Sequence, residues 1–296
     1  MEHHHEHKVR GKNLVLTILL NVIITVAEAI GGFITGSMAL LSDASHNLSD
    51  VISLIVTYAA NRLSLRKATE KETFGFKRSE IIAAFINSST LIVLAILILV
   101  EAIKRIAIPE PVSANWVIYL AILSIVINGL SVLLIVKDAH GNMNVKSAFL
   151  HLFSDMLTSI GVLISGLAMK YFQWFWIDSL ISVAIAVYLI FMSWNILVNS
   201  LKILMQFTPD NLEFDKITDD IQQIEGIRNI HHIHIWKLDE HQIMLEAHID
   251  LNNDVKITEF ETILNNISTC LKKYDIYHYT IQPEFSVDDN KQKIYR

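Results

Sequence analysis

Six long apolar runs fill the first two thirds of this sequence and limit what it can fold into. Each has about the 20 residues that a helix needs to cross a bilayer at a rise of about 1.5 Å per residue. The whole chain is 52% hydrophobic and only 18% charged, whereas about a quarter of the residues of a soluble protein are charged. The sequence therefore predicts an α-helical membrane protein with six transmembrane helices, at 13–36, 37–60, 81–103, 115–136, 147–169 and 177–200.

The loops between these runs differ in positive charge, and this difference predicts the orientation. The N-terminal tail and the loops at 61–79 and 137–147 together hold eleven Lys and Arg residues, whereas the alternate loops hold only Lys104, Arg105 and Lys170. Cytoplasmic loops carry the excess of Lys and Arg. We therefore expect a multi-pass protein of the cell's inner membrane with both termini in the cytoplasm.

The chain changes character after residue 207. Residues 1–207 hold 15 basic and 13 acidic residues, whereas 208–296 hold 9 and 17. The acidic part shows two amphipathic helical patterns and three strand patterns, which together predict a small α+β domain whose helices cover one face of its sheet. These patterns are a helix at 211–225, strands at 228–238 and 242–251, a helix at 256–273 and a strand at 276–285.

The predicted domains are therefore a transmembrane domain at 13–207 and a cytoplasmic domain at 208–290, with short tails at 1–12 and 291–296. The last six residues are expected to be a frayed end. The first tail is rich in histidine, and it could capture metal near the pore, be a mobile tail, or be a cloning tag. Cys270 is the one cysteine of the chain, so neither an internal disulfide nor a CxxC metal site can form.

Two histidine–aspartate pairs stand out inside the apolar runs. His46 and Asp50 lie four residues apart in the second run, as do His151 and Asp155 in the fifth. This spacing puts both side chains of a pair on one helix face, and ionisable groups within lipid are costly unless they have a function. Two such helices facing each other would supply two nitrogens and two oxygens, a full tetrahedral set for zinc.

A simpler explanation is open for each polar residue within the membrane. A single HxxxD pair could serve only as a hydrogen bond between helices, and it is the presence of two pairs that favours a metal site. Asp43 could be a fifth ligand or a helix-start cap. Glu28 and Glu101 are expected to pair with polar neighbours rather than bind metal.

At the level of motifs, the chain resembles the cation diffusion facilitators, a family of proton-coupled exporters of zinc and related divalent metals. No single string is specific, but their order along almost the whole chain is. The matching strings are Glu28-Ala-Ile-Gly-Gly32, Gly36-Ser-Met-Ala-Leu-Leu-Ser-Asp-Ala-Ser-His46 with Asp50, Thr73-Phe-Gly-Phe-Lys-Arg-Ser-Glu80, His151 with Asp155, Thr208-Pro209, His231-His-Ile-His-Ile-Trp236 and His278-Tyr-Thr-Ile-Gln-Pro-Glu284.

This resemblance implies a ferredoxin-like cytoplasmic domain, a homodimer, and a transport site at His46, Asp50, His151 and Asp155. Because the first position is His46 rather than Asp, it also implies zinc in preference to cadmium. Regulatory metal sites in the family lie at the dimer seam, and the matching positions here are His231, His248 and Glu284. The tail histidines could instead be solvated residues on a strand face.

Strand alternation adds an expectation about the histidines near the start of the cytoplasmic domain. A regular strand has a side-chain period of two. It would therefore place His232, His234 and Trp236 on one face and His231, Ile233 and Ile235 on the other.

The residues predict a mechanism. Zinc needs neutral imidazole and ionised carboxylate, so protons and metal compete for the same groups, and histidine titrates near physiological pH. We expect export of zinc from the cytoplasm by metal/proton antiport, with zinc as cargo and as a candidate regulatory ion, and with no cofactor, no enzymatic activity and no nucleic-acid partner.

Two other functions also use metal-binding residues within a membrane. A membrane metallohydrolase would need an open coordination position and a general base, as in HExxH, and the sequence contains no HExxH. A membrane-bound zinc sensor would bind metal without moving it, but it would not need two pairs within the bilayer.

Overall fold

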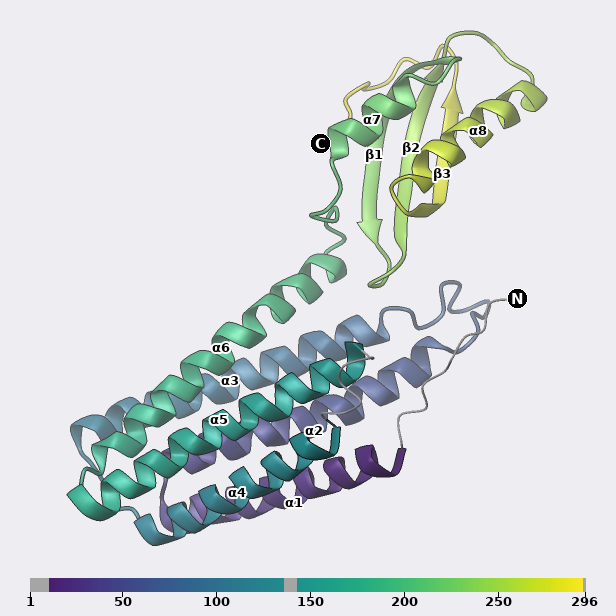
Figure 1. Ribbon diagram of the computed structural model, residues 1–296. Coiled ribbons are helices and arrows are strands. Elements are labelled where there is room, and N and C mark those ends of the chain that lie inside the picture. Colours follow the sequence, from purple (N-terminus) through teal and green to yellow (C-terminus); the bar gives the residue numbers. More distant parts are fainter. Residues whose placement is uncertain (1–10, 136–142, 295–296) are drawn as a thin grey trace. The chain divides into compact units, whose positions relative to one another are not determined.

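The computed structural model describes residues 11–135 and 143–294 (Figure 1). Six long helices come first, and each one overlaps a predicted span, which confirms the six-helix architecture. They are α1 (Gly11–Thr35), α2 (Met38–Ser64), α3 (Ser79–Ala107), α4 (Ala114–Ile135), α5 (Met143–Phe172) and α6 (Trp176–Leu204). The His-rich tail, and with it the metal-capture hypothesis, lies outside the described residues.

Four of the described helices are long and apolar enough by themselves to cross a membrane. These are α3, α6, and the described apolar parts of α4 and α5. In α1 the described apolar part is shorter, and α2 is the least apolar of the six helices because it contains Asp43, His46 and Asp50.

The chain divides into two compact units, each described here by itself. The first comprises the residues up to 56 together with 86–197, and the second comprises 57–85 together with 198–296. The second unit therefore includes the end of α2, the beginning of α3 and the end of α6, in addition to the C-terminal domain.

Within the first unit, α4 packs against both α1 and α5, and two glycines make the close approach possible. A Cβ added at Gly31 of α1 would collide with Leu120 Cδ1, and one added at Gly166 of α5 would lie 2.9 Å from Ile118 Cγ1. Small residues at such crossings let helix backbones approach each other in lipid. Large apolar side chains such as Phe33 and Phe191 are exposed on the outside of the helices, as expected for surfaces that face lipid.

Asp178, in the first turn of α6, fixes the beginning of α2. Its carboxylate accepts hydrogen bonds from the Ser37 hydroxyl (2.6 Å), from the backbone N–H groups of Met38 (2.6 Å) and Ala39 (3.2 Å), and from the Ser165 hydroxyl (3.2 Å). The first N–H groups of a helix have no partner within the helix. Asp178 therefore caps α2 from another helix and fixes the position of the helix that carries His46 and Asp50.

We expect Asp178→Ala to destabilise the protein by about 1–3 kcal/mol, because it leaves buried donors without their acceptor. Thermal unfolding of the purified protein in detergent measures this loss. Asp178→Asn is the matched control, since it keeps one acceptor oxygen and should lose less. Equal melting temperatures for the wild type and the alanine variant would show that the cap does not contribute to stability.

The C-terminal domain has the predicted order of elements and confirms the predicted layer arrangement. Its elements are α7 (Phe214–Gln222), β1 (Ile227–Lys237), β2 (Ile243–Leu251), α8 (Ile257–Lys272) and β3 (Ile276–Glu284). The sheet has the order β1-β2-β3, with β1 and β2 antiparallel and β2 and β3 parallel. Both helices cover one face of it (Figure 1), and apolar residues such as Ile217, Ile249 and Ile267 form the core between helices and sheet.

Strand β1 corrects the expected alternation of its side chains. Its register against β2 shifts between Ile227 and Asn229 and again between His231 and His234, and His232 has a positive φ of 49°. Each shift adds one residue to β1 and so reverses the side-chain pattern. Ile230 and Ile233 both join the core beneath the helices, whereas His231 lies on the other face of the sheet.

The expected frayed end is wrong for residues 291–294. The backbone N–H groups of His232 and Ile233 donate hydrogen bonds to the carbonyls of Gln292 (3.1 Å) and Lys293 (2.8 Å). The segment after β3 therefore docks along the edge of β1, where strand N–H groups would otherwise lack a partner.

Candidate metal sites

The first cluster of metal-binding groups lies within the membrane helices. His46 and Asp50 of α2 and Asp155 of α5 each offer one ligand atom, and these atoms lie within 4.8 Å of one another. Asp155 is fully buried and His46 nearly so. The fourth predicted ligand, His151, lies on α5 one turn before Asp155, but its side chain is outside the described residues.

One contact in this cluster has the spacing of two ligands on a tetrahedral ion. His46 Nε2 lies 3.3 Å from Asp155 Oδ1, and two ligands that are each about 2.0–2.1 Å from zinc at a tetrahedral angle lie about 3.3 Å apart. Asp50 Oδ2 lies 3.5 Å from the other ring nitrogen, His46 Nδ1. The imidazole thus stands between two carboxylates, an arrangement that can hold either a metal ion on one nitrogen or a proton.

A layer of hydrogen bonds fixes these helices around the cluster. Asp43 of α2 accepts hydrogen bonds from the hydroxyls of Thr158 (2.7 Å) and Ser159 (3.0 Å) on α5. The Asn47 side-chain amide donates to Glu28 Oε2 at 3.0 Å, so Glu28 has the polar partner that was expected. Such outer contacts orient the residues that hold a metal.

Neither role considered for Asp43 matches the structure. Asp43 is not among the residues of the cluster, and it is not at the helix start, because α2 begins at Met38. Ser37 is the residue at the cap, and its hydroxyl accepts the N–H of Leu40 at 3.1 Å. Glu101 of α3 forms ion pairs with Lys104 and Arg105, as expected.

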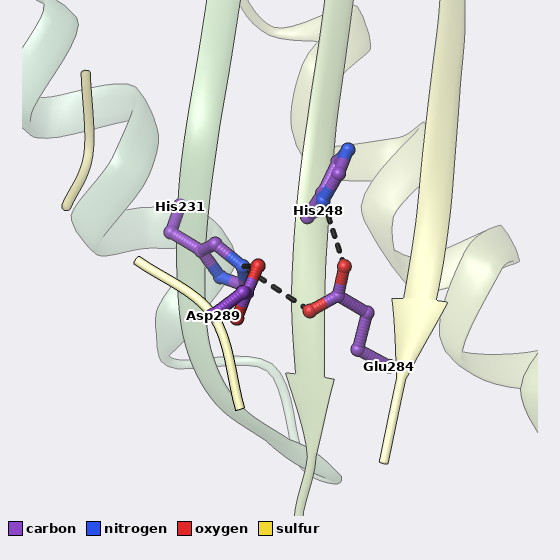
Figure 2. Close-up of side chains that lie close together, drawn as sticks. All are labelled: His231, His248, Glu284 and Asp289. Carbon is purple, nitrogen blue, oxygen red and sulfur yellow. Dashed lines mark ion pairs between the residues drawn. The ribbon is translucent and has the colours of Figure 1, made fainter. Parts of the chain in front are cut away.

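The second cluster lies on the face of the C-terminal sheet that the helices leave open. Figure 2 shows His231, His248 and Glu284 on three neighbouring strands, with Asp289 reaching them from the segment after β3. Strand pairing explains the convergence. His231 of β1 is directly opposite His248 of β2. His248 is in turn paired with Gln282 of β3, and Glu284 follows two residues later on the same face of that strand. The structure therefore brings together the three cytoplasmic residues that the resemblance implied.

The geometry of this cluster also suits a divalent ion. His231 Nε2 lies 3.3 Å from Glu284 Oε2 and 3.4 Å from Asp289 Oδ2, and His248 Nδ1 lies 2.7 Å from Glu284 Oε1. The four groups offer ligand atoms within 4.8 Å of one another. Two imidazole nitrogens and two carboxylate oxygens form a donor set that zinc accepts.

Sequence reasoning missed two acidic residues here. Asp250 Oδ2 lies 3.8 Å from His231 Nδ1, beside the cluster, and Asp289 belongs to the cluster itself. Strand alternation places Asp250 on the same face as His248, so that signal was available. Nothing in the sequence indicated that the segment after β3 turns back onto the sheet.

Comparison with known proteins identifies the family. Residues 14–205 match the model described as the cation efflux transmembrane domain, about two thirds of the chain. The chain belongs to the cation efflux family. A second model, the cytoplasmic domain of cation efflux proteins, matches residues 209–286, and the resemblance to the cation diffusion facilitators is thus confirmed. Members of this family are transporters, so the protein is a multi-pass membrane transporter and not an enzyme.

Several named cation efflux proteins are similar over most of their length. One is the cadmium, cobalt and zinc/H(+)-K(+) antiporter of Bacillus subtilis, 37% identical over 99% of this chain and 95% of its own length. Another is the metal cation efflux system protein CzcD of Cupriavidus metallidurans, 33% identical over 96% and 90%. A third is the zinc transporter ZitB of Escherichia coli, 32% identical over 88% and 83%.

Proposed function

We propose that this cation efflux protein exports zinc from the cytoplasm in exchange for protons, through a site formed by His46, Asp50, His151 and Asp155. The observation that carries the proposal is the convergence of His46, Asp50 and Asp155, from two helices, into one buried cluster. Two carboxylates balance the charge of a divalent ion, so the bound ion removes the cost of burying them.

Competition between metal and proton supplies the coupling. With metal absent, a proton on His46 would be paired on both sides, because each ring nitrogen faces a carboxylate. Zinc requires the ring neutral and the carboxylates ionised, so its binding expels protons. If the site opens to each side in turn, zinc enters from the cytoplasm and protons displace it on the more acidic side.

The names of the relatives support this cargo and this exchange. Zinc is named for the Bacillus subtilis and Escherichia coli proteins, and the former is named as an antiporter that also handles cadmium, cobalt, H⁺ and K⁺. We propose zinc as the main cargo here, because His46 contributes an imidazole nitrogen. We also propose a homodimer, since the cytoplasmic domain matches the family's dimer domain.

The cytoplasmic cluster is proposed to bind zinc as a regulatory ion. Its support is the donor set of His231, His248, Glu284 and Asp289, which is complete within one chain. A site outside the membrane helices cannot itself carry ions across, so its occupancy would report the metal level on the cytoplasmic side.

Flux in reconstituted vesicles tests the transport proposal. Vesicles with an acidic lumen should accumulate zinc through the protein while the lumen becomes more alkaline on zinc addition, and a protonophore, which collapses the pH gradient beforehand, should abolish the accumulation. Repeating the assay with and without luminal K⁺ separates proton exchange from K⁺ exchange. Zinc binding without accumulation would show a sensor rather than a transporter.

A further inference from the structure

The cytoplasmic cluster contains a cation that belongs to the chain itself. Lys291 Nζ lies 2.9 Å from Glu284 Oε2, 2.9 Å from Asp250 Oδ1 and 3.4 Å from His231 Nε2, and it also pairs with Asp289. Glu284, His231 and Asp289 are groups that would hold zinc, and Asp250 lies beside them. A lysine ammonium and a zinc ion therefore compete for the same lone pairs.

Charge explains why the lysine is held there. Glu284, Asp250 and Asp289 bring three carboxylates onto the open face of the sheet, and Glu284 and Asp250 are almost fully buried. Burial by itself raises the pKa of Glu284, but its hydrogen bond to Lys291 and the lysine charge outweigh burial, so the pKa is below its usual value. Without a counter-ion these carboxylates would be costly to bury, and the lysine fills that role.

The segment that carries Lys291 has its own anchors. Its backbone bonds to His232 and Ile233 at the edge of β1, directly after the ligand His231. Lys293 Nζ reaches the Thr218 hydroxyl (2.9 Å) and Asp219 Oδ1 (3.3 Å) on α7. The tail therefore contacts the strand directly beside the cluster. The match to the family's cytoplasmic-domain model ends at residue 286, before this tail begins.

We propose that Lys291 is a tethered cation that keeps the cytoplasmic site closed when zinc is scarce, and that zinc displaces it and undocks residues 291–294. The inference rests on the proposed cytoplasmic zinc site. It gives the site two states, a lysine-bound state with the tail docked and a zinc-bound state with the tail released. The displaced ammonium lowers the apparent zinc affinity, and so sets the metal level at which the site fills.

Zinc affinity tests the competition. We use the full-length protein in detergent with Asp155→Ala, so that the membrane site does not contribute, and titrate zinc by calorimetry. Lys291→Met should raise the affinity of the cytoplasmic site at least tenfold, and Lys291→Arg, which keeps the cation, should stay near the parent. Lys272→Met on α8 is the matched control for loss of an unrelated lysine. A chain ended after Asn290 replaces Lys291→Met if that variant folds poorly, because it also removes the lysine and keeps Asp289.

Hydrogen exchange tests the release. Zinc should speed amide exchange in residues 288–294 and at His232 and Ile233, and tryptic cleavage after Lys291 should become faster. Unchanged or slower exchange in the tail on zinc addition would overturn the release, and unchanged affinity in Lys291→Met would overturn the competition.

A further variant separates this proposal from the site on which it rests. Adding His248→Ala should abolish the cytoplasmic zinc binding. If binding persists unchanged, the cytoplasmic site itself is wrong. If His248→Ala abolishes binding, but Lys291→Met does not change the zinc affinity and zinc does not change hydrogen exchange in the tail, the zinc site is correct and the proposal for Lys291 is wrong.

Discussion

Asp155→Ala is expected to reduce pH-gradient-driven zinc transport at least a hundredfold. Asp155 is the described α5 carboxylate of the membrane cluster, it is fully buried, and it lies 3.3 Å from His46 Nε2. Its loss leaves a divalent ion with one carboxylate in a medium that does not solvate charge, and the penalty for such an unbalanced ion is several kcal/mol. Each 1.36 kcal/mol is a factor of ten in rate, so a hundredfold loss is a conservative expectation.

The measurement is initial zinc uptake into acidic vesicles, with protein content matched. Asp155→Asn should fail almost as completely, because it keeps the shape and removes the charge. Thermal unfolding of each purified variant in detergent shows whether it is folded. Full uptake by Asp155→Ala, or by His46→Ala, would contradict the proposed transport site.

The second large effect is expected on selectivity. His46→Asp should lower the ratio of zinc to cadmium transport at least tenfold. The imidazole nitrogen of His46 is a borderline donor that suits zinc in a small tetrahedral site, whereas an added carboxylate gives a more oxygen-rich and more negative site that discriminates less by ligand type. The shorter side chain also enlarges the site, which favours the larger ion.

Both ions are measured in one vesicle preparation, so that the ratio does not depend on the amount of active protein. Cobalt serves as a third ion, close to zinc in size. If His46→Asp transports less of every ion but keeps the wild-type ratio, the imidazole does not set the preference and our account of selectivity is wrong.

The membrane helices show what a local pattern can predict. The six apolar runs gave the helices to within a few residues at most ends, because lipid requires every backbone group to be satisfied within the segment. The HxxxD spacing placed each pair on one helix face, since a helix returns to the same side after four residues. The sequence could only suggest, from the matching pairs in two apolar runs, that the second and fifth helices face each other. The structure shows the contact between them, from His46 of α2 to Asp155 of α5.

The cytoplasmic cluster shows where a local pattern fails. Regular alternation placed His231 with Ile233, but a bulge in β1 separates them, and a bulge depends on the partner strand and not on the local sequence. The end of the chain was expected to fray. Its order comes from β1, α7 and the carboxylates around Lys291.

The sequence by itself determined the membrane architecture, the order of elements in the C-terminal domain, the family and the candidate ligands, because all of these depend on composition and on short-range spacing. Only the tertiary structure decided which side chains meet. It placed Asp178 at the start of α2, Asp43 of α2 against Thr158 of α5 rather than in the cluster, and Lys291 against Asp250 beside the cytoplasmic ligands. Each of these contacts joins residues far apart in the chain or beyond a bulge, where no sequence period extends and charge and burial determine the partner.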